Sequence, residues 1–499
     1  MELQFQKSAC SCLNTAVREV QNQELTQEMK LTDGMPDIGR VLSAWGQGIM
    51  RSKEWRGDSV ALSGGMMVWV LYAPEDGTNP RCISGWIPFQ MQWPLPDGTR
   101  EGNIRIRCLT RFADARSVSP RKLMLRAGVG VMAEVFSPME GEIYAPTEVP
   151  EDVELLRRHY PLRLPKEAGE KPFLLDEELR LPESAPQPEK LLCFTLRPEV
   201  TDKKVLANKV VFRGNGNLHV LYLSEEGRLC AWDFELPFSQ FDELQSSHSG
   251  DAQADVALMP TSLELEADDE GLLRLKCGLV GQYVIDDQEV VEIVEDAYSR
   301  TRELKPQTEM TELPAVLDAR REMIYGEQTL PVETDRVVDT AFLPDFPRQR
   351  RREDGVDLEM TGNLQMLYYG EDGSLQSANA RWEGNCSLSA DGDSRIACLP
   401  MGVPQPQMSR SGGGMTAKFQ LPMDIVTTAA GGIPVVTGLE LGEKREPDES
   451  RPSLILRRAG GSGLWETAKT CGSTVAAIRN ANHLQEEPEA GQMLIIPVL

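Results

Sequence analysis

Residues 62–77 read LSGGMMVWVLYAPEDG, and two later segments repeat the pattern. Residues 212–227 read FRGNGNLHVLYLSEEG, and residues 360–373 read MTGNLQMLYYGEDG. Each is an apolar run that reaches Leu-Tyr and continues into two acidic residues and Gly. The run predicts a strand, and the acidic pair with Gly predicts a tight turn, because Gly readily adopts positive φ angles. The pattern therefore predicts three β-hairpins.

A tryptophan follows each predicted turn: Trp86, Trp232 and Trp382 lie 9, 5 and 9 residues after the turn glycine. The alternation of apolar and polar residues around them predicts a returning strand with the indole in the core. Short strand-like runs separated by Gly and Pro follow each hairpin. Because such repeats indicate one structural unit used several times, we expect a mainly β chain. Its three β-sandwich or barrel-like modules are expected at residues 1–145, 174–298 and 323–443.

The regions between the modules differ in composition from the strand-like runs. Two of them contain candidate helices, at residues 153–159 and 313–325. Residues 144–172 are rich in Pro and Glu, residues 299–314 are polar, and residues 442–452 have almost no apolar residue. These three stretches are expected to be linkers.

The charge of the chain limits its partners. The formal net charge is -25 in 499 residues, and the pI is about 4.7. Such a surface repels phosphate backbones, so we expect no nucleic-acid partner, and it disfavours anionic membranes and wall polymers. The only basic cluster, RQRRR at residues 348–352, is expected in a loop of the third module.

The sequence has no segment expected to cross or enter a membrane. The longest strongly apolar stretches span about seven residues, whereas a transmembrane helix needs roughly 20. The first residues lack the basic and apolar regions of a secretory signal. We therefore expect a cytoplasmic protein with no transmembrane segment.

Residues able to carry catalysis are dispersed. The ten cysteines include no CxxC pair and no zinc-type spacing with histidine. Cys10 and Cys12 form the one close pair, for which a metal or redox role is the alternative to a structural one. No histidine lies near an evident nucleophile, and His219 is expected to be packed or solvent-facing in a strand. We therefore expect no enzyme, no cofactor and no metal.

Residues 453–499 have a different pattern, which predicts a small β-α-α-β domain. Strand-like runs lie at residues 454–456 and 493–496. Between them, Leu464, Ala468 and Cys471 share one helix face, and Val475, Ile478 and Ala481 share a face of a second helix. Gly472 is placed to end the first helix, and Ser473 or Thr474 to cap the second.

This domain resembles the LysM module. The matching residues are Leu464-Trp465, Ala468, Cys471-Gly472, Val475, Ile478, Ala481-Asn482 and residues 491–497, GQMLIIP. One departure is that Gly461-Ser462-Gly463-Leu464 stands where LysM modules usually have Gly-Asp-Thr-Leu. The resemblance implies a groove between two loops, with partner-binding residues Ser462, Gly463, Leu464 and Trp465 on one side and Asn482, His483, Leu484 and Gln485 on the other.

Repeated modules of this kind followed by a LysM domain resemble the SPOCS-domain proteins of spore-forming clostridia. That resemblance implies a non-enzymatic scaffold for spore coat assembly in the mother-cell cytoplasm. It also implies docking through the LysM domain onto the coat basement ATPase SpoIVA at the forespore surface, with other coat proteins as further partners. Because the Asp and Thr of the LysM pattern are absent, we expect the groove to bind protein rather than glycan. The alternative is a peptidoglycan- or chitin-binding protein of the cell wall or cortex.

Overall fold

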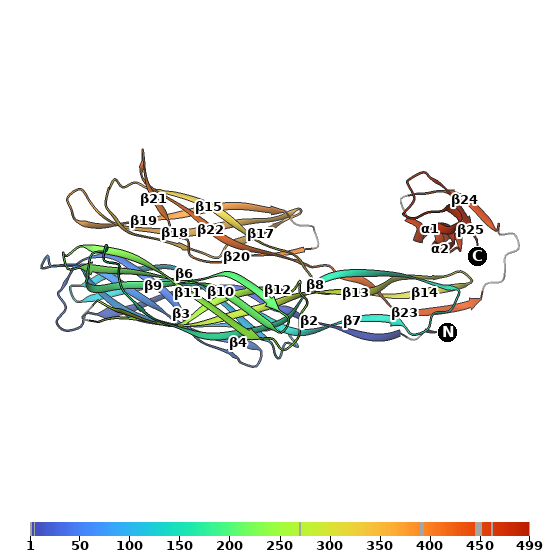
Figure 1. The fold of residues 1–499 in the computed structure, drawn as a ribbon, viewed down its shortest axis with the longest axis horizontal. Helices are drawn as coiled ribbons and strands as arrows, with labels where there is room; N and C mark the ends of the chain where they lie inside the picture. The colour runs from blue at the N-terminus through green and yellow to red at the C-terminus, as the bar shows by residue number, and fades with distance from the viewer. Residues whose placement is uncertain are drawn as a thin grey trace.

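The structure is a computed structural model that describes residues 2–3, 5–268, 271–389, 394–444, 452–460 and 463–498. The chain is mainly β, as expected, and the described residues contain two short helices, both near the C-terminus (Figure 1). The strands form pairs of three- or four-stranded antiparallel sheets, each pair enclosing apolar side chains. This arrangement confirms the expected sandwich-like architecture.

The first pair of sheets comprises residues 5–146. One sheet has the order β2-β7-β6 and the other β3-β4-β5. A core of alternating inward-facing residues, including Val68 and Val129, fills the space between them. The strands are β2 (Phe5–Lys30), β3 (Ile38–Trp55), β4 (Ser59–Pro74), β5 (Arg81–Pro94), β6 (Asn103–Ser119) and β7 (Lys122–Pro146).

The same strand order recurs in the next pair of sheets, as β8-β13-β12 and β9-β10-β11. In both pairs, the last of the six strands therefore lies between the first and the fifth, and the second, third and fourth strands form the other sheet. The strands are β8 (Val153–Leu179), β9 (Pro188–Leu206), β10 (Lys209–Ser224), β11 (Leu229–Glu243), β12 (Gln253–Ala267) and β13 (Leu273–Ser299).

The third pair follows this order with two strands divided. β16 and β17 both pair with β18, which also pairs with β19, while β20 and β21 both pair with β22, which also pairs with β15. The basic cluster forms β17 and is therefore not the expected loop. The strands are β15 (Val316–Leu330), β16 (Val337–Pro344), β17 (Arg348–Arg352), β18 (Gly355–Tyr369), β19 (Leu375–Ser389), β20 (Ser394–Pro400), β21 (Gln407–Ser411) and β22 (Gly414–Ala429).

The three predicted hairpins are present as β4–β5, β10–β11 and β18–β19. Their turn glycines, Gly77, Gly227 and Gly373, have φ angles of 73°, 72° and 74°. These positive values are accessible to Gly without steric penalty. The Leu-Tyr and acidic-Gly pattern therefore identified the hairpins correctly.

The three tryptophans lie on the corresponding strands but in different registers. Trp86 is opposite Met67, Trp232 is opposite Val220 and Trp382 is opposite Gly362. Trp382 is buried, as expected, whereas Trp86 and Trp232 are half-buried. Trp86 does not join the core of its own module, because the buried positions of β5 are the odd-numbered ones and Trp86 lies on the opposite face, beside Arg51. There it packs, half-buried, against the apolar cluster centred on the second module, as Trp232 does.

The modules pack against one another and share a core. Trp45, Trp69 and Leu71 of the first module and Leu367 of the third join the apolar cluster of the second. Two buried glutamines connect the backbones of the first two modules. Gln47 exchanges two hydrogen bonds of 2.8 Å with Leu196, and Gln282 exchanges bonds of 2.8 and 2.9 Å with Ile106.

A long arm extends from the packed modules (Figure 1). The outer ends of β2 and β7, and those of β8 and β13, form two of its antiparallel two-stranded ribbons. A small sheet in the order β1-β23-β14 completes it, with β1 (Glu2–Leu3), β14 (Arg302–Thr311) and β23 (Ile433–Lys444). Apolar side chains from all three modules, such as Cys10, Ile293 and Val435, meet inside the arm.

The regions expected to connect the modules are largely strands, and most of them belong to the arm. Residues 153–159 and 313–325 are not helical: they contribute to β8 and β15. Most of the two linkers expected at 144–172 and 299–314 is strand as well. β8 forms one edge of its sheet, where a proline can be tolerated because an N–H that faces away from the sheet makes no hydrogen bond to another strand. The charged residues of β8 face solvent or pair across strands, as Arg157 does with Glu292. Of the third expected linker, residues 445–451 lie outside the described residues.

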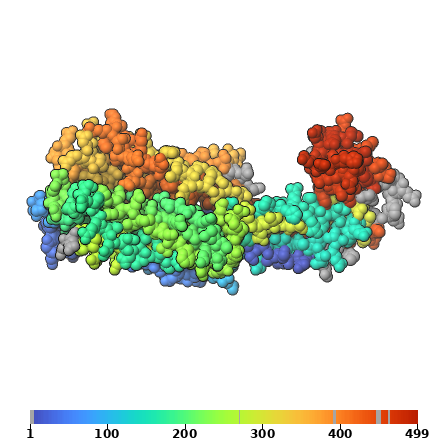
Figure 2. Space-filling model, in the orientation of Figure 1, coloured from blue at the N-terminus to red at the C-terminus, as the bar shows by residue number. Residues whose placement is uncertain are grey.

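The C-terminal domain has the predicted β-α-α-β order: β24 (Leu454–Arg458), α1 (Gly463–Cys471), α2 (Val475–Asn482) and β25 (Met493–Pro497). β24 pairs antiparallel with β25, and the side chain of Thr474 caps α2 by accepting a hydrogen bond from the N–H of Ala477. Figure 2 shows the domain resting on the arm, away from the packed modules.

Candidate functional site

The first group of residues expected to bind a partner lies at the start of α1. Ser462 is outside the described residues. Gly463 is exposed, with φ of 73°, and Leu464 is 1% exposed in the core of the domain. Leu464 can therefore support the site but is not available for contact with a partner.

Trp465 is half-buried and occupied by the chain's own arm. Its ring packs edge-on against Tyr298 at the end of β13, with 4.8 Å between ring centroids. Its indole N–H donates to Asp296 at 2.8 Å, and Lys469 forms an ion pair with the same carboxylate at 2.7 Å. The hydroxyl of Tyr298, which is 5% exposed, donates to the carbonyl of Ser473 at 2.8 Å. Trp465 is thus part of an intramolecular docking contact.

The second group follows α2 and has mixed environments. Asn482 is bound to β25: its amide donates to the carbonyl of Ile495 at 2.6 Å, and its oxygen accepts from the N–H of Ile495 at 2.7 Å. His483, which has a φ of 54°, and Gln485 are exposed, whereas Leu484 packs against the core of the domain.

Glu487, which lies two residues after the second group, contacts the first group. Its carboxylate accepts a hydrogen bond from the N–H of Leu464 at 3.1 Å and forms an ion pair with Arg479 at 3.3 Å. Gly463, His483 and Gln485 are exposed, and a loop-lined site that includes them stays a prediction. Asp296 and Tyr298 could not be predicted from the sequence, because no local pattern indicates which strand meets a domain more than 150 residues away.

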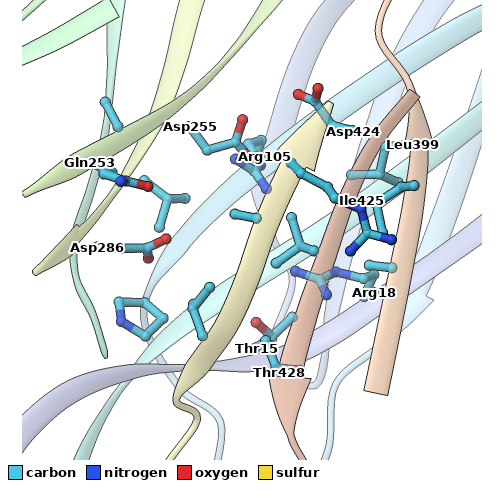
Figure 3. Close-up of a pocket in the computed structure, with 18 of the residues that line it drawn as sticks. Thr15, Arg18, Arg105, Gln253, Asp255, Asp286, Leu399, Asp424, Ile425 and Thr428 are labelled. Atoms are coloured by element: carbon cyan, nitrogen blue, oxygen red, sulfur yellow. Dashed lines mark hydrogen bonds and ion pairs between the residues drawn. The ribbon is translucent and has the colours of Figure 1, made fainter. Parts of the chain in front are cut away.

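A second candidate is a cavity of about 1140 Å³ between the three modules. Its walls come from β2, β6, β12, β13, β20 and β22 (Figure 3). Arg105, Asp255 and Asp286 reach it from three different strands. Its charged groups are largely paired with one another: Arg105 bonds Asp255 at 2.7 Å, and Arg321 bonds Asp424 at 2.7 Å.

The buried ion cluster on one wall fixes the charge states there. Burial alone would raise the pKa of Glu134, but Arg105, Arg18 and Arg107 outweigh it and lower that pKa to about 2. No described residue pairs with Asp286 as the arginines do with Glu134. Burial and the nearby Asp255 carboxylate raise its pKa to about 7, although Arg105 partly opposes them. The cavity therefore contains one carboxyl group that titrates near neutral pH.

A smaller cavity of about 190 Å³ lies where β3, β9 and β16 meet. His219 lines it between two carboxylates, 2.9 Å from Asp233 and 3.1 Å from Asp339. Trp45 donates its indole N–H to Asp339 at 3.1 Å. Burial alone would lower the pKa of His219, but the two carboxylates raise it to about 10. His219 is thus packed, one of its two expected settings, and carries a charge that links the second and third modules.

The remaining reactive side chains have structural environments. His248 is buried between Glu167 and Asp287, 3.3 Å from each. Cys10 and Cys12 are buried in the arm, and burial together with Glu289 raises the pKa of the Cys10 thiol to about 11, which disfavours the reactive thiolate. Within the described ranges, no three His, Cys, Asp or Glu side chains are grouped so as to hold a metal ion. No helix in those ranges has the length and apolar character needed to span a membrane.

Part of the second module is similar to a known protein family. Searches of curated proteins and of solved structures found no similar protein. Residues 187–266, which include β9, β10, β11 and nearly all of β12, match the family model described as SipL, SPOCS domain. In the second module, the chain is therefore similar to the SPOCS domain of SipL.

Proposed function

We propose that the protein is a non-enzymatic scaffold for spore coat assembly. The match of the second module to the SipL SPOCS domain carries this proposal. It is supported by the strand order that the other two modules share with the second, and by the β-α-α-β domain at the C-terminus. In this proposal the modules act as one body, because residues of the first and third modules join the apolar cluster of the second and buried glutamines connect the first two.

The proposed partner of the C-terminal, LysM-like domain is the coat basement ATPase SpoIVA, with other coat proteins binding the modules. The proposed location is the mother-cell cytoplasm at the surface of the forespore. The absence of the Asp and Thr that LysM modules carry near positions 462 and 463 favours a protein over a glycan. The domain also lies on an arm, where it is accessible to a large partner (Figure 2).

A binding experiment tests this proposal. The purified full chain and a chain lacking residues 453–499 are each titrated against a SpoIVA-type ATPase and against peptidoglycan fragments. We expect the full chain to bind the ATPase and the truncated chain, with its modules folded, to lose that binding. Tight binding to peptidoglycan with none to the ATPase would instead support the cell-wall or cortex alternative.

A further inference from the structure

The outer face of the C-terminal sheet is apolar, and no other part of the described chain covers it. Leu454 and Leu456 of β24 are 59% and 69% exposed, and Met493 and Ile495 of β25 are 52% and 41% exposed. Most large apolar side chains of the described chain are buried, so four exposed ones on ten strand residues form an unusual concentration. Contiguous apolar surface of this kind marks interaction sites in soluble proteins.

The strand register places these side chains on one face. Leu456 is opposite Ile495, Arg458 is opposite Met493, and Leu454 is opposite Pro497. Directly paired residues in an antiparallel ladder point to the same side, and residues two apart along a strand do as well. The other face carries Leu494 and Ile496, which are at most 1% exposed beneath the helices. The apolar face is therefore directed away from α1 and α2.

The helical side of the domain is already occupied, since α1 holds Tyr298 and Asp296 of the arm through Trp465 and Lys469. The sheet face has no such contact among the described residues. The domain is thus held on the arm by one side and presents the opposite, apolar side to solvent.

The positive charge of Arg458 indicates which kind of partner would dock on this face. Arg458 is exposed, lies on the same face as Leu454 and Leu456, and forms no ion pair with another described residue. The same face of a second copy of this chain carries apolar side chains and another arginine, so it offers no carboxylate to pair with Arg458. A partner with a carboxylate beside an apolar stripe would instead pair with Arg458 as its apolar side chains are covered.

We propose that the outer face of β24 and β25, consisting of Leu454, Leu456, Arg458, Met493 and Ile495, docks an amphipathic helix of a partner protein that carries Asp or Glu at the border of its apolar stripe. Five strand residues extend about 16 Å, which matches about three turns of helix. The proposal rests on the proposed function only in giving this domain a docking role, and it assigns that role to the sheet rather than to the loop-lined groove.

Site-specific photocrosslinking tests the occupant. Benzoylphenylalanine is placed at Leu456 of the full chain, or at Val290 as a control, which is 67% exposed on the arm. After irradiation in extract of sporulating cells, the crosslinked peptide is sequenced. We expect position 456, and not 290, to capture a segment of another protein with apolar residues at helical spacing and a flanking carboxylate. Capture of a second copy of this chain, of lipid, of a segment without that pattern, or of nothing beyond the control would overturn the proposal.

Binding of the captured protein, once purified, provides the second measurement. Leu456→Asp and Ile495→Asp in the full chain should each weaken binding at least tenfold, and Arg458→Glu should weaken it severalfold, whereas Val290→Asp should not. All three sheet positions are solvent-exposed, so circular dichroism should show unchanged folding.

Different results would contradict the proposed docking on the ATPase and the proposed docking on the sheet face. If SpoIVA-type ATPase binds the full chain and its Leu456→Asp variant equally well, the proposed function stands and the sheet-face proposal is wrong. If the captured protein is not the ATPase but shows the helical pattern and the expected losses, the sheet-face proposal stands and docking on the ATPase fails.

Discussion

At the scale of single residues, His219 shows how a buried charge can hold two modules together. Its imidazolium lies between Asp233 of its own module and Asp339 of the third, and Asp339 is only 7% exposed. Replacing His219 by Gln keeps a polar side chain but leaves Asp339 without a cation. Breaking a buried pair in this way costs about 3–5 kcal/mol, so we expect His219→Gln to lower the urea midpoint clearly.

The pH dependence of this effect identifies its cause. The pKa of His219 is raised from 6.5 to about 10 by folding, so its contribution to stability is fully present below about pH 6.5 and is lost as the pH rises through 10. The difference in unfolding free energy between wild type and His219→Gln should therefore shrink toward pH 10. A constant difference would indicate lost packing rather than lost charge.

Asp286 also makes the protein less stable as the pH rises, but over a lower pH range. Folding raises its pKa from 3.8 to about 7, so the native state loses stability between about pH 4 and pH 7, and the full cost of the buried carboxylate is present above pH 7. We expect Asp286→Asn to change stability little at pH 4 and to stabilise the protein at pH 8.5, measured by urea unfolding at both values. Equal stability of the two proteins at pH 8.5 would show that the carboxylate is well solvated in the cavity.

At the scale of elements, the corresponding strands β11 and β19 provide a matched comparison. Trp382 is 5% exposed and packs edge-on against Phe342 and Phe419, whereas Trp232 is half-buried at the edge of its core. Removing a fully buried Trp side chain costs about 3–5 kcal/mol. We expect Trp382→Ala to cost that amount and Trp232→Ala about 1–2 kcal/mol, with thermal unfolding midpoints in the same order. If Trp232→Ala is the more destabilising substitution, the burial of the indole does not determine its contribution to the free energy of unfolding.

The elements that could be predicted from the sequence are those with local signals. The hairpins β4–β5, β10–β11 and β18–β19 were predictable because a strand, a turn glycine and a second strand follow one another directly, and the C-terminal domain was predictable because its helices have a clear 3.6-residue period. Strand β8 could not be predicted in this way. Its prolines and charges are typical of a linker, and its partner strand β13 lies about 120 residues further along the chain. The contact of Trp465 with Tyr298 could not be predicted either, because the two residues are also far apart in the sequence. This contact decides how much of the expected groove is free to bind a partner.

At the scale of the whole molecule, the arm fixes the position of the C-terminal domain through few contacts. Of the arm side chains that the structure describes, only Tyr298 joins the domain's buried cluster, and it also bonds the carbonyl of Ser473. We expect Tyr298→Ala to loosen this docking while both partners stay folded. Hydrogen-exchange mass spectrometry should then show faster exchange in peptides covering the end of β13 and α1, and unchanged exchange in the modules.

A control separates loosening from general destabilisation. Tyr325→Ala removes a side chain that is 75% exposed on β15 and should leave exchange unchanged everywhere. If Tyr298→Ala also leaves α1 unchanged, then Asp296, which bonds both Trp465 and Lys469, is sufficient to hold the domain. If exchange rises throughout the modules instead, the arm and the modules unfold as one cooperative unit, and the domain is an integral part of the body rather than a docked one.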